Sequence, residues 1–377
     1  MILGLFGVPD VLIKNVAIGF NAKNWDYIGN NIFTATRLCG VLSLCLSIFF
    51  ISLSYFISNN IFFEPRLYLP LIIFFIALTP QVLSRLYSAC FIGFGKIWQS
   101  NLVDQTLSIW ITLILFCMLL IFNITISIYN VAIIYALGRI SVTIFTWIYW
   151  KKIFSYKSKF IMLTKDITKS SIPLLLVVGT NFLSASIATI MLGIMSNVTE
   201  VGLFSVCSRL AILMIFFLQV SDSAISPKLA ALYKSNKIKE MQKMVQSVTG
   251  LLILVGTIIF LFFILFGEYI LYLWGGDFAN SYLILIILVF GQFINISTGA
   301  CSKLLIMCGF EKLQSKISIF TLVLNFILNF IFIYLYEAKG AAIAVTLTLI
   351  VQNSLMLLFA YSKVGVMTIP FLKGKIK

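Results

Sequence analysis

Histidine is absent from this chain of 377 residues, and acidic side chains are scarce, with 12 aspartates and glutamates in all. The seven cysteines are scattered, no two of them form a CxxC pair, and most lie inside apolar segments. Zinc and haem sites draw on histidine and on closely spaced cysteines, so the sequence predicts neither. Isolated cysteines in apolar segments behave as small buried hydrophobic residues, and we predict no metal and no other cofactor.

Charge of either sign is also rare, since charged residues make up 10% of the chain and apolar residues 61%. Soluble domains carry about a quarter charged residues. A bilayer accommodates such a composition because its interior is itself apolar. The net charge of +15 would suit nucleic acid if the cations shared one soluble face, but they lie in the gaps between apolar runs. We therefore predict an integral membrane protein with membrane lipids, and not nucleic acid, as partners.

Charge-free stretches predict where the chain crosses the membrane, because a helix needs about 20 apolar residues to do so. The stretch after Asp104 is too long for one crossing, and the polar break at Asn123-Ile124-Thr125 divides it. Residues 1–20 are apolar but short and carry Pro9, Asp10 and Lys14, which indicates the end of a transmembrane helix. Ten full crossings are predicted near 38–58, 67–92, 103–123, 127–150, 172–194, 201–223, 246–267, 280–306, 317–336 and 340–362.

The cations predict the orientation of these helices. With the loop after residue 20 inside the cell, 22 lysines and arginines fall in inner loops or at inner helix ends, and Arg85 is counted among them. The outer loops then hold only Arg66 and Lys339. This excess of positive charge on one side indicates that the C-terminus is cytoplasmic.

The basic stretch between Lys151 and Lys169 predicts a division of the chain into two lobes. We expect an N-terminal lobe at 1–150, a basic cytoplasmic linker at 151–171, a C-terminal lobe at 172–363 and a basic tail at 364–377. Secondary transporters built from two such lobes bind their substrate near the middle of the membrane.

Several short motifs follow one another along the chain from Ile172 onward. Ile172-Pro173 opens a helix, Cys308-Gly309 precedes a basic loop, and Lys339-Gly340-Ala341-Ala342 opens the last helix. Longer motifs are MLGIMSNVTEVGLFSVCSRLA at 191–211, SPKLAALYKSNKIKEMQKMV at 226–245 and LFGEYILYLWGGDFANSYLILIILVFGQ at 265–292. Together they resemble the polysaccharide-transport branch of the MOP exporter superfamily, in particular Wzx-type flippases of O-antigen.

The resemblance implies an all-α integral membrane fold, a two-lobed helical bundle of the MATE/MOP type with twelve helices, of which this sequence begins inside the second. It implies a flippase in the bacterial inner membrane that moves an undecaprenyl-pyrophosphate-linked oligosaccharide across the bilayer, driven by an ion gradient. Other membrane proteins of polysaccharide assembly are the further partners it implies. Many relatives carry an aspartate five residues before Gly193, and Ala188 stands at that place here.

Three cations lie within the predicted crossings, where a charge must face a cavity or a partner. Arg139 is central in its crossing, and its guanidinium suits phosphate oxygens, although an ion pair with a buried acid is the alternative. Arg209 lies about two turns from the outer surface and either binds substrate or reaches the interface along its own stem. Lys14 follows Asp10 by one turn, so the pair either lines a cavity or neutralises itself.

Acids that titrate within a membrane can carry protons, and Asp222, Asp104 and Asp10 are the candidates for ion coupling. Asp222 and Asp104 stand near helix ends, where capping or pairing is the alternative role. Amides within the crossings either join helices or contact sugars. The candidates for sugar contact are Asn181, Gln292, Asn295, Asn325 and Asn329.

Two other functions compete with the flippase. A membrane-embedded polysaccharide polymerase or ligase would need a large external loop for its catalytic residues, and the predicted outer loops span about a dozen residues at most. No GxSxG motif or phosphate-binding loop is found, and we predict that the protein is not an enzyme. A drug or cation antiporter would favour buried acids, whereas the charges here are mostly positive and favour an anionic substrate.

Overall fold

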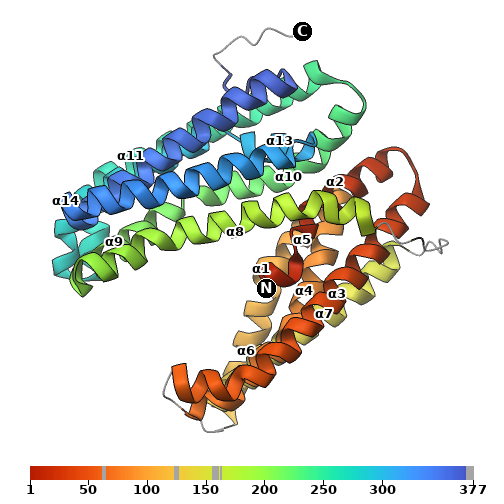
Figure 1. Cartoon of the computed structure of the whole chain (residues 1–377), viewed down its shortest axis with the longest axis horizontal. Helices are drawn as coiled ribbons and strands as arrows, with labels where there is room; N and C mark the ends of the chain where they lie inside the picture. Colours follow the sequence, from red (N-terminus) through yellow and green to blue (C-terminus); the bar gives the residue numbers. More distant parts are fainter. Residues whose placement is uncertain (62–64, 123–126, 155–160, 162–163, 371–377) are drawn as a thin grey trace. The chain divides into compact units, whose positions relative to one another are not determined.

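The computed structural model describes residues 1–61, 65–122, 127–154, 161 and 164–370, without the side chains of residues 61, 104, 105, 165 and 277. Every regular element in these residues is a helix (Figure 1). The chain forms two compact units, residues 1–175 and 176–377, and the division falls inside α8 (Thr164–Met195). The predicted all-helical membrane fold is confirmed.

The first unit is built around α4 (Tyr68–Gly93), which packs against α2 (Val8–Asn21), α3 (Trp25–Phe56) and α7 (Ile128–Ile153). The short α1 (Ile2–Leu5) precedes α2, and α5 (Ile97–Asn101) with the π-helical turn η3 (Leu102–Thr106) leads into α6 (Leu107–Ile121). Two further short elements, η1 (Ile57–Ile61) and η2 (Pro65–Leu67), end α3 and begin α4.

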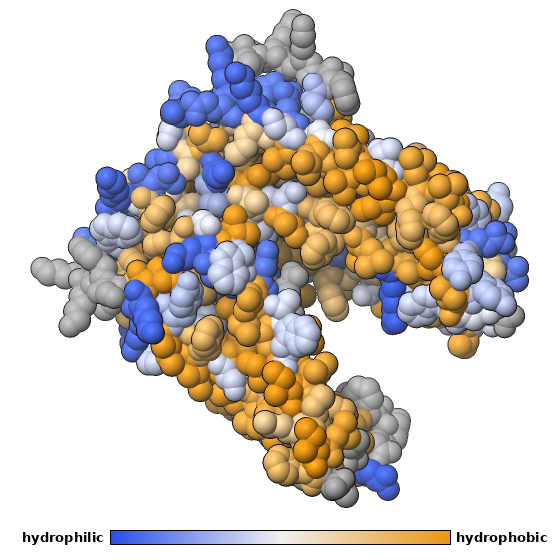
Figure 2. Space-filling view, turned by 180° about the vertical axis from the view of Figure 1, so that it is seen from behind, coloured by the Kyte–Doolittle hydropathy of each residue, from blue (hydrophilic) through white to orange (hydrophobic). Residues whose placement is uncertain are grey.

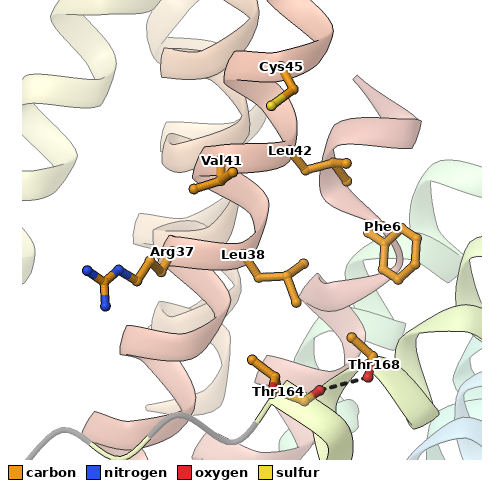
Figure 3. A pocket seen from close by; sticks show the side chains of 8 residues that line it. All are labelled: Phe6, Arg37, Leu38, Val41, Leu42, Cys45, Thr164 and Thr168. Atoms are coloured by element: carbon orange, nitrogen blue, oxygen red, sulfur yellow. Dashed lines mark hydrogen bonds between the residues drawn. The ribbon is translucent and has the colours of Figure 1, made fainter.

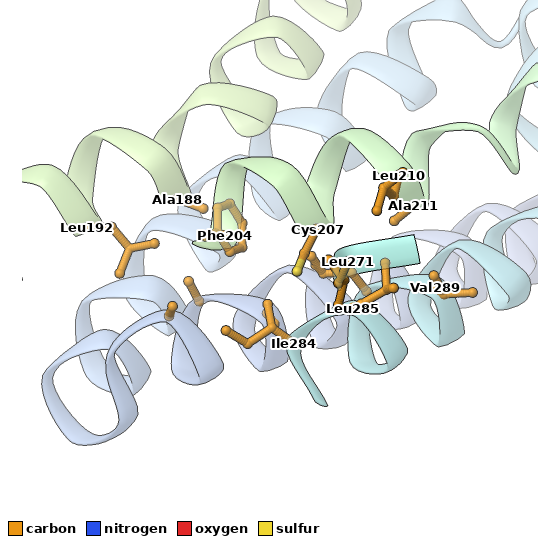
Figure 4. Close-up of a cluster of buried hydrophobic side chains, with 14 of the residues drawn as sticks. Ala188, Leu192, Phe204, Cys207, Leu210, Ala211, Leu271, Ile284, Leu285 and Val289 are labelled. Carbon is orange, nitrogen blue, oxygen red and sulfur yellow. The ribbon is translucent and has the colours of Figure 1, made fainter. Parts of the chain in front are cut away.

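The second unit contains the rest of α8 and the helices that follow it. They are α9 (Val198–Ile212), α10 (Ile215–Lys234), α11 (Ile238–Trp274), η4 (Gly276–Ser281), α12 (Tyr282–Ser297), α13 (Cys301–Met307), α14 (Glu311–Phe359) and η5 (Ala360–Val364). Its largest core cluster joins α8, α9, α11, α12 and α14, with Leu192, Cys207, Leu271 and Leu285 fully buried (Figure 4). Ala188, where many relatives have an aspartate, is part of this core and is 1% exposed.

Helix α14 supplies two of the predicted crossings. The backbone reverses at Glu337, whose φ of 49° and ψ of −127° are not helical. The two halves run antiparallel, because Gln314 reaches Met356 and Asn325 reaches Thr348. Glu200, at the start of α9, accepts a hydrogen bond from the backbone amide of Ala338 at this turn.

Among the described residues, eight helices are long and apolar enough to cross a membrane, or nine with the bent pair α9–α10. Helix α6 has 15 residues and lies where the crossing at 103–123 is predicted. The break predicted at 123–125 lies outside the described residues. In each unit of Figure 2, hydrophobic side chains cover the middle of the helices and hydrophilic ones gather toward the helix ends, which fits a membrane environment.

The helix that carries the crossing predicted at 38–58 is longer than that crossing, because α3 begins at Trp25. Asn24 caps it, with its side-chain oxygen accepting a hydrogen bond from the Tyr27 amide at 3.0 Å. Asp26 and Arg37 mark the limit of an apolar run but do not break a helix, so the helix continues past them.

Candidate functional site

Charged side chains from three helices meet inside the first unit. Asp10 and Lys14 lie one turn apart on α2, Arg85 lies on α4 and Arg139 lies on α7, and all four are half-buried. Asp10 and Arg139 are both close enough to Arg85 to act on its charge. Asp10, Lys14 and Arg85 each interact with another group of the structure. We call these four residues the unit-1 charge cluster.

Arg139 is held differently from the rest of the cluster. Its guanidinium carbon lies over the ring of Tyr135, one turn earlier on α7, at 5.3 Å from the ring centroid. Its Nε is buried and has no hydrogen-bond partner among the described residues. A stacked guanidinium keeps its edge available for a planar anion, so Arg139 can donate to a ligand without first breaking a bond within the protein.

Close packing and one side-chain bond fix the helix that carries Arg139. The Thr143 hydroxyl donates to the carbonyl of Pro80 on α4 at 2.8 Å. On the other side, a Cβ at Gly138 would lie 2.6 Å from the hydroxyl oxygen of Thr112 on α6. These contacts hold α7 between α4 and α6 and set the direction in which Arg139 projects.

Sequence reasoning missed Arg85 as a member of the site, because it was counted among the cations at inner helix ends. It lies eight residues before Gly93, the last residue of α4, or about 12 Å along the helix. The predicted span 67–92 already places Arg85 well inside the crossing, because the span continues for seven residues after it. With Arg85 included, the unit-1 charge cluster has three cations and one acid.

Arg209 and Asn181 lie in the second unit, apart from one another in the sequence and both exposed. Arg209 is on the face of α9 opposite the buried Phe204, Cys207 and Ala211. Asn181 is near the middle of α8. An exposed charge in the last turn of α9 and an exposed amide near the middle of α8 suit a water-accessible surface better than contact with lipid tails.

Two of the amides predicted to contact sugars lie on α14, and one of them, Asn325, joins this helix to α8. The Asn325 amide donates to the carbonyl of Ser184 at 3.1 Å, and the Asn329 amide donates to the side-chain oxygen of Asn325 at 2.7 Å. Asn325 is 3% exposed and Asn329 is fully buried. In this arrangement Asn325 takes the interhelical role that was its alternative, and Asn329 supports it from within α14.

Gln292 and Asn295 belong to a second network in the same unit. The Asn295 amide donates to the Gln292 side-chain oxygen at 3.2 Å and accepts from the Asn353 amide at 3.1 Å. Thr298, in the break between α12 and α13, donates to Asn353 at 2.9 Å. This network ties α12 to the second half of α14.

Of the remaining acids, Asp222 lies in the middle of α10 and not near a helix end as predicted, and Asp104 lies just before α6. Asp222 is half-buried on α10 and interacts with another group of the structure. Its negative charge also acts on the thiol of Cys301, at the start of α13. Asp104 lies in η3, but its side chain is outside the described residues. The coupling role of both acids stays a prediction, as does sugar contact by Asn181.

The buried amides give a first prediction, on stability. Replacing Asn325 by leucine leaves the Ser184 carbonyl and the Asn329 amide without this partner, and we expect a loss of about 1 kcal/mol. Thermal unfolding of the purified protein in detergent should show a lower melting temperature. Asn181→Leu, at an exposed position on α8, is the control and should leave it unchanged. Equal melting temperatures for the two variants would contradict the role of the network.

Comparison with known proteins relates this architecture to a family. Residues 173–331 match the MatE family model. The capsular polysaccharide biosynthesis protein CapF of Staphylococcus aureus is 28% identical over 185 residues, or 49% of this chain. The match spans about half of that relative's length, 47%.

Solved transporters share the fold over nearly the whole chain. A MATE protein in the bent conformation superposes with a TM-score of 0.82 at 16% identity, covering 96% of this chain and 84% of that one. A MATE transporter of Vibrio cholerae gives 0.80 at 13% identity over 96% and 85%. A MOP superfamily transporter of Pyrococcus furiosus gives 0.74 at 14% identity over 97% and 85%. The chain thus has the fold of the MATE transporters of the MOP superfamily, with the MatE family match in its second half, and these are transporters rather than enzymes.

Proposed function

We propose that this protein moves a lipid-linked oligosaccharide, an undecaprenyl-pyrophosphate-linked repeat unit of a surface polysaccharide, from the inner to the outer leaflet of the bacterial inner membrane. The observation that carries the proposal is the excess of cations in the unit-1 charge cluster, three against one acid. The resemblance to Wzx implies that the oligosaccharide is an O-antigen unit. The match to the MatE family model does not identify a substrate, so this assignment belongs to the proposal.

The energetics of charge in a membrane favour an anionic substrate. A cation at the centre of a span costs at least about 2.5–3.5 kcal/mol, so it is kept where it has a function or a partner. Asp10 can neutralise one of Lys14 and Arg85, and Arg139 adds a further positive charge close to Arg85. A pyrophosphate offers the charge and the oxygens that this excess requires.

Two relatives support a role in polysaccharide transport and a pocket whose charge differs among proteins of this fold. CapF is named for capsular polysaccharide biosynthesis. The Pyrococcus furiosus transporter is described as having a binding pocket of reversed polarity that suggests a different function. The polarity of the pocket therefore varies among chains of this fold, and the positive balance in this chain favours an anionic substrate over a cationic drug.

Each candidate residue has a place in the proposed mechanism. Arg139 and Arg85 bind the phosphate oxygens, and Asp10 and Lys14 set the local charge beside them. Within the second unit, Arg209 stays a candidate for contact with phosphate and Asn181 a candidate for contact with sugar. An ion gradient drives the cycle through a carboxylate, with Asp10, Asp222 and Asp104 as candidates, since the sequence has no histidine.

Reconstitution tests the proposal. Purified protein in liposomes should make a polyprenyl-pyrophosphate-linked oligosaccharide on the inner leaflet accessible to an added glycosidase, and protein-free liposomes should not. Efflux of a cationic dye is measured in parallel. Dye efflux without movement of the glycolipid would contradict the proposal and would identify a cation exporter.

A further inference from the structure

An apolar groove opens on the first unit between α3 and the start of α8. Its volume is about 530 Å³, and its lining residues are Phe6, Arg37, Leu38, Val41, Leu42, Cys45, Thr164 and Thr168 (Figure 3). Its wall is almost entirely hydrocarbon, and the Thr168 hydroxyl is already bonded to the Thr164 carbonyl at 2.7 Å. Such a wall accepts a hydrocarbon chain and offers nothing to a sugar.

A break in the first helix shapes this groove. Phe6 and Gly7 both have positive φ, 48° and 69°, and separate α1 from α2. A Cβ at Gly7 would lie 2.5 Å from the backbone nitrogen of Leu175 and from the carbonyl oxygen of Ser171, so the break packs directly on α8. Phe6 lies opposite Leu38 and Leu42 of α3, so that these side chains face each other across the groove (Figure 3).

The groove begins where the hydrocarbon of the inner leaflet is predicted to begin. The crossing formed by α3 is predicted at 38–58, so Arg37 stands at its inner border. Cys45 lies eight residues further, or about 12 Å into the membrane. The groove therefore runs from the interface toward the middle of the bilayer and is aligned with a lipid tail.

Arg37 lies at the edge of the groove, where its guanidinium points away from Phe6 and Leu42 (Figure 3). Its side chain is exposed, and its guanidinium carbon lies over Phe33 at 5.4 Å from the ring centroid. No acid pairs with Arg37 among the residues whose side chains are described. The charge of Asp166, in the first turn of α8, acts on the hydroxyl of Tyr27, which lies ten residues before Arg37 on α3.

We propose that this groove is a binding site for an anionic phospholipid of the inner leaflet, with one acyl chain along Phe6, Leu38 and Leu42 and the phosphate at Arg37. Charge complementarity supports this occupant, since an interfacial arginine without an acid attracts an anionic headgroup. The site is separate from the unit-1 charge cluster and does not depend on the proposed function.

Native mass spectrometry of the detergent-purified full chain with phosphatidylglycerol tests the site. We expect one tightly retained lipid, with about fivefold lower apparent affinity for Arg37→Gln and near-normal affinity for Arg37→Lys. Lys23→Gln, at another exposed cation on the same side, is the matched control and should bind as the unaltered protein does. Leu42→Trp should exclude the chain, and Leu113→Trp on α6 is its control.

Competition identifies the occupant. Phosphatidylethanolamine should compete poorly because it has no net charge. Equal binding of that lipid, or equal binding by Arg37→Gln, would overturn the phosphate assignment. Undecaprenyl phosphate that displaces phosphatidylglycerol at equal concentration would show that the groove serves the substrate tail and would overturn the assignment to phospholipid. Unchanged binding by Leu42→Trp would place the lipid elsewhere.

Discussion

Replacing Arg139 by alanine should abolish surface glycan in cells that depend on this protein for its display. The residue contributes a stacked guanidinium over Tyr135 with a buried Nε that no described residue bonds. Loss of a charge-assisted bond to phosphate costs about 1.5–3 kcal/mol, or roughly a 10- to 150-fold loss of affinity. Arg139→Glu should be at least as damaging, because it removes a cation beside Arg85 and adds an acid.

The measurement is glycan display in a complementation assay, together with the amount of protein in the membrane. Arg139→Lys should restore part of the activity, since lysine keeps the charge and loses the bidentate geometry. Arg66→Ala changes a cation in a predicted outer loop and should leave display unchanged. Full activity of Arg139→Ala at normal protein levels would show that Arg139 does not bind the substrate.

Replacing Gly340 by alanine should have the largest effect on stability. Gly340 follows the reversal at Glu337, and a Cβ there would overlap the carbonyl oxygen of Phe332 and approach the backbone of Ile333. Backbone atoms within a packed helix cannot move aside as the end of a flexible side chain can. The substitution should cost about 3 kcal/mol or more, because it forces the two halves of α14 apart.

Thermal unfolding and the yield of folded protein measure this effect. Gly202→Ala on α9 is the matched control, because a Cβ at Gly202 would meet nothing within 4 Å. Alanine is the better helix former, so the control should be neutral or stabilised by up to about 1 kcal/mol. If Gly340→Ala melted no lower than Gly202→Ala, the close approach at the reversal would be wrong.

The sequence was sufficient to locate the apolar segments that form the long helices, but not the ends of those helices. Hydrophobic length sets where a helix can cross, and this information is local. The end of a helix depends on caps and breakers, so α3 begins at its Asn24 cap and not at the charge of Arg37. The break at Phe6-Gly7 has a local signal in Gly7 and Pro9, but the packing of Gly7 on Ser171 and Leu175 depends on tertiary structure that the sequence does not reveal.

Only some residues of the candidate site could be predicted, because tertiary packing brings the others to their partners. Arg139 and Lys14 could be found one residue at a time, because a charge inside an apolar run is visible in the sequence. Arg85 was assigned to a helix end, and only the packing of α4 between α2 and α7 places it with Asp10 and Arg139. The roles of Asn325 and Asn329 also depend on which helices face each other, and the sequence alone could not decide between a sugar and Ser184.

Binding of a polyprenyl pyrophosphate to the purified protein in lipid nanodiscs tests the central claim most directly. The unit-1 charge cluster predicts an affinity that falls as salt is raised and falls about 10- to 100-fold further in the double variant Arg85→Gln/Arg139→Gln. The double variant Arg66→Gln/Lys339→Gln, which removes two cations from predicted outer loops, should bind as the unaltered protein does. Equal binding by both double variants would contradict the claim that these interior arginines recognise the phosphates.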